Sequence, residues 1–150
     1  MVKNFRIRAA NIKDLEKVCR VEYASFSHDP YPPFLIERLL RDEESMFFVA
    51  TDQSDEIMGY LVSKIEDHYA HLISLAILPP ERRSGAATQL LEALVSALRE
   101  REVHEVQLEV RSDNKAAIQL YSEFGFSEQR IILGYYSDGS PALLMRRVIE

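Results

Sequence analysis

The sequence predicts an α/β protein in which one mixed β-sheet carries helices on both faces. Three observations support this fold class. Short stretches of alternating or continuous apolar residues, which indicate strands, are interleaved with stretches of helical periodicity. The expected order is strand, two helices, three strands, helix, strand, helix and two strands. With 150 residues, of which 47% are hydrophobic and 28% charged, the chain is expected to form one domain over residues 1–150.

The elements of the first half follow from local patterns. FRIRAA alternates as a strand does, and Asn11 stands where it can cap the following helix. The prolines of SHDPYPP disfavour a regular helix or strand, so this stretch is expected to be a loop. The polar turn DQSDE separates two strand-like stretches and indicates a hairpin. HLISLAI is apolar nearly throughout, as expected of a strand covered on both faces. The expected elements are a strand at 5–10, helices at 11–26 and 34–42, and strands at 45–51, 57–66 and 71–78.

The second half begins with a long amphipathic helix, expected at 85–101. Its buried stripe is marked by Leu90, Leu91, Leu94, Val95 and Leu98. HEVQLEVR then alternates as a strand with apolar residues on one face. A short helix follows, for which Ser112 or Asp113 is the expected cap and Gly125 the expected stop. Two more strands, at 127–136 and 142–149, are joined through the turn signal Asp138-Gly139.

Composition narrows the classes of function. The net charge of −6 disfavours nucleic acid as a partner and suits a cationic substrate such as an amine. No apolar run is long enough to span a membrane, and the start of the chain lacks the pattern of a signal peptide. Cys19 is the single cysteine, which excludes an internal disulfide, and the histidines form no metal-ligand pattern. We therefore expect a cytoplasmic protein without a metal.

The loop PPERRSGAATQLL leads from an apolar strand into the long helix. Gly85 allows a tight turn, and the small side chains of Ala86 and Ala87 leave room for a ligand. The first amides of the helix lack internal partners, and with Arg82 and Arg83 they can bind a phosphate or pyrophosphate. A glycine turn between two solvated arginines is the alternative interpretation. The sequence contains neither a Walker-type loop nor a Rossmann fingerprint.

Three ordered motifs carry a resemblance to a known family. RRSGAA fits the pattern [Q/R]-x-x-G-x-[G/A] of the GCN5-related N-acetyltransferases (GNAT), and LEVRSDNKAAIQLYSEFGF resembles their second signature. YYSDG resembles the end of the protein N-terminal acetyltransferases of the RimI and arrest-defective types. The resemblance extends over residues 4–149. Ala87 stands where glycine is commoner, which the pattern permits, and Ala86 is smaller than the usual Ile or Leu. Glu81 stands where an aromatic residue is common and places a negative charge near the expected pyrophosphate.

The resemblance implies a mostly antiparallel sheet that splays open to form an acetyl-coenzyme A (acetyl-CoA) cleft. Backbone amides before the long helix are implied to hold the pyrophosphate, and the backbone of the HLISLAI strand to pair with the pantetheine arm. Asn114 would face the pantetheine, and Tyr121 would be aimed at the departing sulfur. The implied cofactor-binding residues are Leu75, Ala76, Ile77, Arg82, Arg83, Ser84, Gly85, Ala86, Ala87, Thr88, Asn114 and Tyr121.

Three residues are candidates for catalysis. Glu109 and His71 are alternative general bases for deprotonating the amine, and the two could share one channel. Tyr121 is the candidate general acid for the leaving thiolate. Each has an ordinary structural alternative: a salt-bridged glutamate, a structural histidine and a buried aromatic with a satisfied hydroxyl. Glu22 is a further residue that could approach the amine.

The implied peptide-binding residues are Tyr31, Phe34, Tyr135 and Tyr136, with packing as the alternative role of each. The function expected from the resemblance is therefore acetylation of the N-terminal α-amine of proteins or peptides. An auxiliary subunit or the ribosome could be a partner. The alternatives are the same chemistry on a small amine or a lysine side chain, and a non-catalytic module that binds acyl-CoA.

Overall fold

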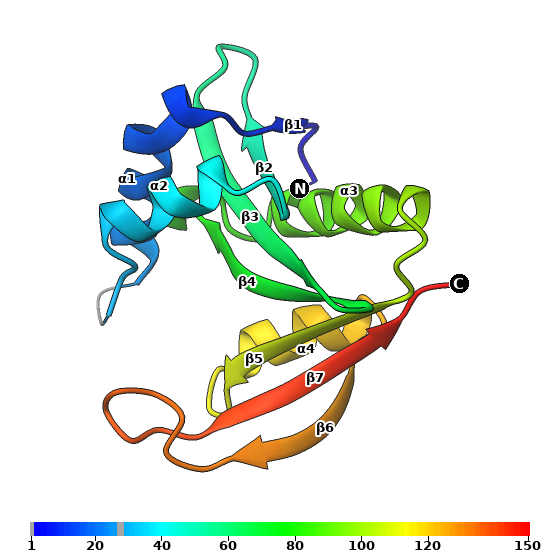
Figure 1. The fold of residues 1–150 in the computed structure, drawn as a ribbon. Coiled ribbons are helices and arrows are strands. Elements are labelled where there is room, and N and C mark those ends of the chain that lie inside the picture. The colour runs from blue at the N-terminus through cyan, green and yellow to red at the C-terminus, as the bar shows by residue number, and fades with distance from the viewer. Residues whose placement is uncertain (1, 27–28) are drawn as a thin grey trace.

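The computed structural model describes residues 2–26 and 29–150, and its strands form one seven-stranded sheet in the order β1-β2-β3-β4-β5-β7-β6 (Figure 1). Neighbouring strands are antiparallel except β4 and β5, which run parallel. The strands are β1 (Arg6–Ala9), β2 (Ser45–Thr51), β3 (Ile57–Glu66), β4 (Tyr69–Ile77), β5 (Glu105–Arg111), β6 (Ser127–Ile132) and β7 (Ala142–Val148). The helices are α1 (Leu15–Ser25), α2 (Pro33–Arg41), α3 (Ala86–Glu100) and α4 (Lys115–Glu123). The expected order of elements and the mixed α/β fold are confirmed.

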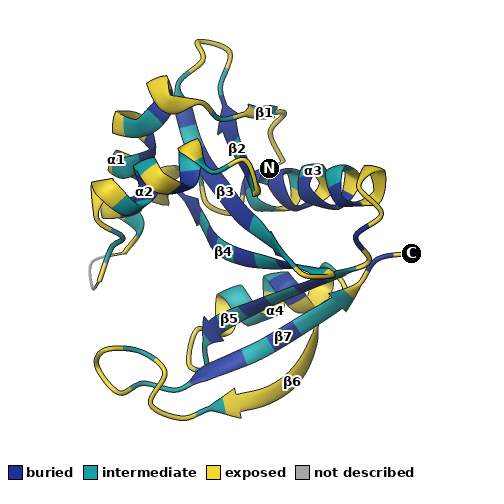
Figure 2. Cartoon of the chain, viewed as in Figure 1, coloured by how far each residue is buried: buried dark blue, intermediate teal, exposed yellow. Residues whose placement is uncertain are grey.

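Helices cover both faces of the sheet, as the patterning predicted. Val18 and Val21 of α1 and Ile36 of α2 pack in one apolar cluster with Phe47 and Tyr60 of the sheet. The buried stripe of α3 packs on the other face in a second cluster, which Tyr121 of α4 and Phe126 also join. Figure 2 shows the buried residues lining the sheet and the inward sides of the helices. The stripe from Leu90 to Leu98 is therefore confirmed as core.

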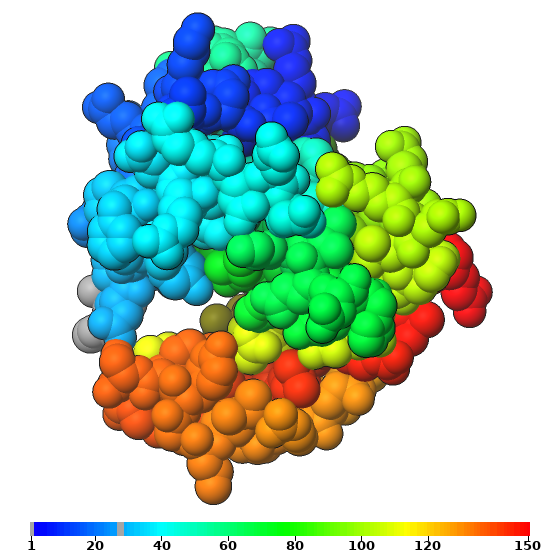
Figure 3. All heavy atoms as spheres, in the orientation of Figure 1, coloured from blue at the N-terminus to red at the C-terminus, as the bar shows by residue number. Residues whose placement is uncertain are grey.

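The parallel contact between β4 and β5 is short, and this opens the sheet. Only Ala70 pairs with Val106 and His71 with Gln107. Beyond these residues β4 stays paired with β3, while β5 stays paired with β7. A register shift near Val62 marks a bulge in the β3–β4 hairpin, and bulges bend strands. The space-filling view shows the surface hollowed between the green atoms of the β3–β4 hairpin and the orange β6–β7 segment (Figure 3).

The start of α1 is built as the sequence suggested, with one extra turn. A 3₁₀ turn at Ile12–Asp14 precedes the helix. Asn11 and Asp14 form a capping box, in which the Lys13 amide donates to Asn11 Oδ1 at 2.9 Å and the Asn11 amide donates to Asp14 Oδ2 at 2.9 Å. Arg8 pairs with the buried Asp14 at 2.9 Å. These bonds hold the start of α1 against β1.

Two local expectations were wrong. The cap of α4 is Asn114, whose Oδ1 accepts from the Ala117 amide at 3.2 Å. Ser112 is unsuited to this role because its amide is still bonded to Pro141 O at the end of β7. The strand expected at 127–136 ends at Ile132, because Gly134 adopts a φ of 65° that no strand residue has. The chain from residue 133 is therefore free to fold back over the sheet.

The end of α4 explains the sequence EFGF. Gly125 has a φ of 93°, the Phe126 amide donates to Tyr121 O at 2.9 Å and the Gly125 amide donates to Ser122 O at 3.1 Å. This is a Schellman motif, which needs the left-handed conformation that glycine tolerates. Phe126 is buried, and Phe124 packs beside the same cluster under the guanidinium of Arg147. Both phenylalanines anchor the helix end, as expected.

Candidate active site

His71 and Glu109 meet where β4 and β5 separate. His71 Nε2 lies 2.7 Å from Glu109 Oε1. Alternation along β5 buries Val106, Leu108 and Val110 on one face and turns Glu109 to the other. The pairing of His71 with Gln107 then sets Glu109 two residues further along the neighbouring strand. The two sequence candidates for the base therefore form one hydrogen-bonded pair.

Tyr135 completes this cluster from the β6–β7 segment. Its hydroxyl donates to Glu109 Oε1 at 3.1 Å. The ring of Tyr136 lies edge-on to that of Tyr135, with 4.9 Å between centroids, and Arg111 lies over Tyr136 at 4.2 Å. Arg111 also pairs with Asp138 at 3.1 Å. The segment after β6 is thus held over the end of β5. Of the four proposed peptide contacts, Tyr135 bonds to a catalytic candidate and Tyr136 packs against Tyr135.

The contact between His71 and Glu109 shifts the pKa of both side chains. Burial raises the pKa of Glu109, but the hydrogen bond and charge of His71 and the hydrogen bond from Tyr135 outweigh it, so the net pKa is lowered. The hydrogen bond to Glu109 raises the pKa of His71 against the opposing effect of burial, and the charges of Glu109 and Glu66 add to it. At neutral pH Glu109 is therefore ionised and able to accept a proton.

The His71–Glu109 pair predicts how stability changes with pH. Because the pKa of His71 in the folded chain lies above its ordinary 6.5, the folded state binds more protons than the unfolded state above that pH. The free energy of unfolding should fall as pH rises through the raised pKa, and the contribution is complete only below about pH 6.5. His71→Gln should remove this fall. Urea unfolding at about pH 6 and about pH 9 measures it; an equal fall in both proteins would contradict the assignment.

Tyr121 lies on α4, behind the opening of the sheet. Its ring packs edge-on against Phe126 with 5.6 Å between centroids, and 9% of the residue is exposed. Burial raises the pKa of its hydroxyl, so the group stays protonated at neutral pH. Within residues 2–26 and 29–150 its hydroxyl makes no hydrogen bond. The structure therefore does not join Tyr121 to the His71–Glu109 pair, and it leaves the proton of this hydroxyl free for another acceptor.

The loop before α3 has the features of an anion site. Arg83 and Gly85 have φ values of 65° and 91°, and the first helical hydrogen bond runs from the Gln89 amide to Gly85 O. Within the described part of the chain, no backbone carbonyl accepts from the amides of Ala86 and Ala87. These amides lie at the positive end of a 15-residue helix. The loop can therefore receive a negatively charged group.

The N-terminal segment braces this loop. Lys3 Nζ pairs with Glu81 at 2.9 Å, which offsets the negative charge that the sequence places near the expected pyrophosphate. The Lys3 amide donates to Ser84 O at 2.8 Å, and Gln89 donates to Lys3 O at 2.7 Å. The hydroxyl of Ser84 is buried and donates to Glu81 O. Ser84 therefore serves the shape of the loop through its side chain.

The free edge of β4 offers backbone groups to the opening. The Leu78 amide donates to Met58 O of the neighbouring chain segment, so alternation turns the backbone of Ala76 toward β3 and that of Leu75 and Ile77 away from it. Ile77 O accepts from Arg82 Nε at 3.2 Å and from Ser25 Oγ at 3.3 Å. Arg82 is thus tied to the strand, although it is exposed, as Arg83 and Thr88 are.

Among the described residues, no hydrogen bond joins the remaining candidates to the His71–Glu109 pair. Tyr31 is half-buried, and its amide donates to Glu22 Oε2 at 2.8 Å. Burial raises the pKa of its hydroxyl, and the charges of Glu22 and Glu109 both add to this. Phe34 is 66% exposed in the first turn of α2, and no hydrogen bond or aromatic contact among the described residues joins it to the cluster. Asn114 is exposed at the start of α4. Glu22 is 1% exposed, so its side chain does not line the surface, and its approach to the amine stays a prediction.

Sequence reasoning overlooked two contacts of the cluster. Glu66 Oε1 lies 3.8 Å from His71 Nδ1 and contributes negative charge on the side of His71 away from Glu109. Arg111 holds Tyr136 in place. Arg111 could have been found, because alternation puts it on the same face of β5 as Glu109. Glu66 depends on the exact register of the β3–β4 hairpin, in which Lys64 pairs with His71, and no sequence signal marks that register.

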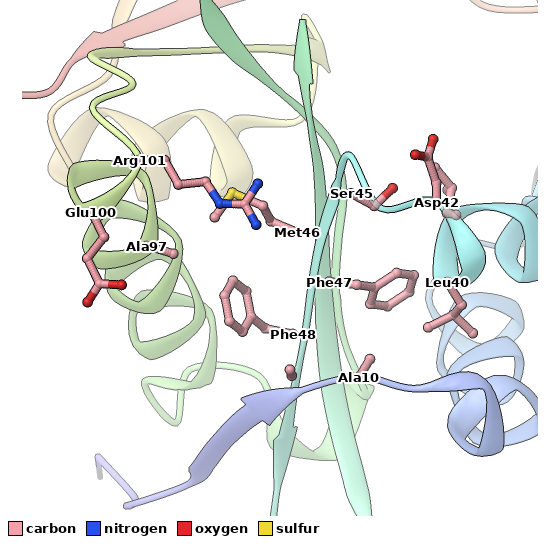
Figure 4. A pocket seen from close by; sticks show the side chains of 12 residues that line it. Ala10, Leu40, Asp42, Ser45, Met46, Phe47, Phe48, Ala97, Glu100 and Arg101 are labelled. Carbon is pink, nitrogen blue, oxygen red and sulfur yellow. The ribbon is translucent and has the colours of Figure 1, made fainter.

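A hollow elsewhere in the molecule carries no catalytic candidate. It lies between α2, the C-terminal end of α3 and β2, with Leu40 on one side and Ala97 on the other (Figure 4). Phe47 and Phe48 point to opposite sides of β2 in it. No set of three or more His, Cys, Asp and Glu side chains among residues 2–26 and 29–150 is placed to hold a metal ion. None of the helices in those residues has the length and apolar character needed to cross a membrane.

Comparison with known proteins gives the family of this fold and site. Residues 10–126 match the acetyltransferase (GNAT) family. The chain belongs to the GNAT acetyltransferase family. Among relatives of this GNAT protein, an N-alpha-acetyltransferase of Sulfurisphaera tokodaii is 34% identical over 95% of this chain and 92% of its own length.

Solved structures of GNAT proteins share the fold. Ard1 from Thermoplasma volcanium has a TM-score of 0.90 at 33% identity, covering 97% of this chain and 98% of its own. The ribosomal-protein-S18-alanine N-acetyltransferase of Escherichia coli has a TM-score of 0.89 at 28% identity, covering 98% and 95%. The mostly antiparallel sheet with helices on both faces is therefore the family fold, as the motifs suggested.

Proposed function

We propose that this GNAT protein transfers the acetyl group of acetyl-CoA to the N-terminal α-amine of proteins or peptides. The observation that carries the proposal is the cluster of His71, Glu109 and Tyr135 at the point where β4 and β5 part. It offers an ionised carboxylate beside aromatic hydroxyls. The relative from Sulfurisphaera tokodaii, which aligns along nearly the whole chain, is named an N-alpha-acetyltransferase, and this supports the same substrate class.

The donor fits the residues present around the opening. The amides of Ala86 and Ala87, the turn at Gly85 and the positive charge of Arg83 suit a pyrophosphate. The unpaired backbone edge at Leu75 and the amide of Ile77 suit an extended amide-bearing arm, which could pair with them as an added strand does. Acetyl-CoA supplies a thioester whose carbonyl carbon an amine can attack. Asn114, Ser84, Arg82, Ala76 and Thr88 stay predictions for this binding site.

Glu109 takes the central step in the proposed mechanism. As an ionised carboxylate with a lowered pKa, it accepts a proton from the substrate amine, directly or through a water molecule, while His71 and Tyr135 hold it in place. The neutral amine nitrogen then bonds to the carbonyl carbon, the carbon–sulfur bond breaks, and the nitrogen loses its second proton to solvent, from which Tyr121 is later reprotonated. Tyr121 donates its proton to the leaving thiolate, since burial keeps the hydroxyl protonated until then.

An α-amine suits such a base better than a lysine side chain does. The reference pKa of an α-amine is about 7.7–8.0, against about 10.4 for lysine. The difference of roughly 2.5 units corresponds to about 3.4 kcal/mol in the cost of reaching the neutral amine at a given pH. Tyr31, Tyr135 and Tyr136 would contact the peptide beside Glu109, with Phe34 further out on α2. A ribosome or auxiliary subunit that delivers the substrate stays a prediction.

Gly85→Ala is expected to raise the KM for acetyl-CoA by about tenfold while changing the peptide KM little. At a φ of 91° an added Cβ is strained, and it would meet Val2 Cγ1 at 3.1 Å and Gln89 Nε2 at 3.4 Å, so the loop must shift. Gly134→Ala is the control, because it has a φ of 65° but no neighbour within 4 Å. Steady-state kinetics at varied acetyl-CoA concentration measures the KM for acetyl-CoA in both variants. Equal values in Gly85→Ala and Gly134→Ala would contradict a role for this loop in binding acetyl-CoA.

A peptide panel tests the proposed function. Peptides beginning with Ser, Ala, Met-Leu or Met-Glu are incubated with acetyl-CoA and read by mass spectrometry, next to small amines such as polyamines. Acetylation of free α-amines with a preference among first residues is the expected result. Turnover of small amines alone would move the protein to another substrate class. Binding of acetyl-CoA without turnover of any amine would point to a non-catalytic module.

A further inference from the structure

Glu22 is a buried carboxylate that the proposed mechanism does not use. It lies in the last turn of α1, and 1% of it is exposed. The hydroxyl of Tyr60 donates to its Oε1, and the Tyr31 amide donates to its Oε2 at 2.8 Å. Tyr60 in turn shares a hydrogen bond of 2.9 Å with Ser74 of β4. Among the described residues no Lys, Arg or His forms an ion pair with Glu22.

A carboxylate in this position is costly for the fold. Its surroundings are the apolar cluster beneath α1 and α2, and burial raises its pKa against the hydrogen bonds from Tyr60 and Tyr31. Buried ionisable groups without a counter-charge destabilise a fold, and an apolar side chain of similar size would pack at this position without that cost. A role other than stability therefore explains the residue better.

The hydrogen bonds of Glu22 connect two parts of the chain, directly to Tyr31 and through Tyr60 to Ser74. Tyr31 belongs to the segment between α1 and α2, and Ser74 belongs to β4, the strand that also carries His71 of the His71–Glu109 pair. Asp29 of the segment between α1 and α2 also accepts a hydrogen bond from the Ser137 hydroxyl, so this segment contacts the chain after β6. Ser137 follows Tyr135 and Tyr136 directly. Glu22 thus joins the α1–α2 segment to the sheet at the place where two chain segments meet over the site.

We propose that Glu22 is a positioning residue for the peptide: it fixes the Tyr31 segment against β4 and so sets one wall of the substrate site. The inference rests on the proposed function for its kinetic consequence, but the structural link itself can be measured without turnover. The residue acts through Tyr31 and Tyr60 and does not touch the reacting atoms.

Three variants separate positioning from stability. Glu22→Ala removes both acceptors, and the KM for the peptide should rise by about tenfold while the KM for acetyl-CoA stays unchanged. Glu22→Gln keeps an oxygen for the Tyr31 amide and an amide group for Tyr60, so it should restore most of the peptide KM. Asp14→Ala is the matched control, because Asp14 is also a buried carboxylate of this helix region but is bonded to Arg8 and Asn11 at the other end of α1.

Hydrogen exchange measures the link directly. Fragments that contain Tyr31 should exchange faster in Glu22→Ala than in the parent protein, and at the parent rate in Asp14→Ala. If exchange and peptide KM respond alike in Glu22→Ala and Asp14→Ala, Glu22 is merely structural and the inference is overturned. If the parent protein acetylates no peptide, the proposed function fails, while the exchange rates still decide whether Glu22 holds the Tyr31 segment.

Discussion

Glu109→Gln is expected to lower kcat/KM for peptide acetylation by about a hundredfold at neutral pH, the size typical of losing a general base. The amide oxygen of Gln can still accept from Tyr135 and His71, so the cluster should keep its shape. What is lost is the ionised group whose pKa His71 and Tyr135 hold low. The affinity for acetyl-CoA should not change, because no hydrogen bond among the described residues joins Glu109 to the loop before α3.

Glu105→Gln is the control for this prediction. Glu105 lies on the same strand and the same face as Glu109, but it pairs with Arg146 at 2.9 Å. Initial rates of Glu109→Gln and Glu105→Gln at several peptide concentrations give kcat/KM. Isothermal titration calorimetry gives the affinity of each variant for coenzyme A. Full activity in Glu109→Gln would remove Glu109 from the mechanism. A loss restricted to His71→Gln would instead assign the base to His71.

Tyr121→Phe is expected to lower kcat by about a hundredfold with little change in either KM, since only the transfer of a proton to the leaving sulfur is lost. The ring and its edge-on contact with Phe126 remain, so the fold should keep its stability. The hydroxyl makes no hydrogen bond within the described residues, so its removal leaves no protein group there without a partner.

Stopped-flow detection of the released thiol, together with thermal unfolding, checks the Tyr121 prediction. Tyr23→Phe serves as the matched variant, because Tyr23 is 58% exposed on α1. Unchanged kcat in Tyr121→Phe would show that the thiolate leaves without help from this hydroxyl. A loss of activity that is accompanied by a large fall in the unfolding temperature would show that Tyr121 is needed for packing alone.

Much of the fold could be predicted because local chemistry and tertiary packing agree. The stripe of α3, the alternation of β5 and the glycine stop of α4 each follow from a short-range pattern, and each is seen in the structure. The two failures lie where a distant contact decided the outcome. Ser112 is held by Pro141, so the cap moves to Asn114. The last strand but one stops early because Gly134 turns the chain back.

The site could be predicted as a set of residues, but its connections could not. Glu109 and His71 were recognisable separately, yet their contact depends on where the parallel pairing of β4 with β5 ends. The hydrogen bond from Tyr135 depends on a segment that folds back after residue 133. The burial of Glu22 depends on how α1 lies on β3. None of these three-dimensional relations leaves a periodic pattern in the sequence.

One peptide can test the central claim most directly. It carries a free α-amine and an internal lysine, and it is incubated with this protein and acetyl-CoA before fragment mass spectrometry locates the acetyl group. The account predicts acetyl on the α-amine, and no reaction in a copy of the peptide whose α-amine is blocked. Acetyl on the lysine of the blocked copy at an undiminished rate would contradict the proposed substrate.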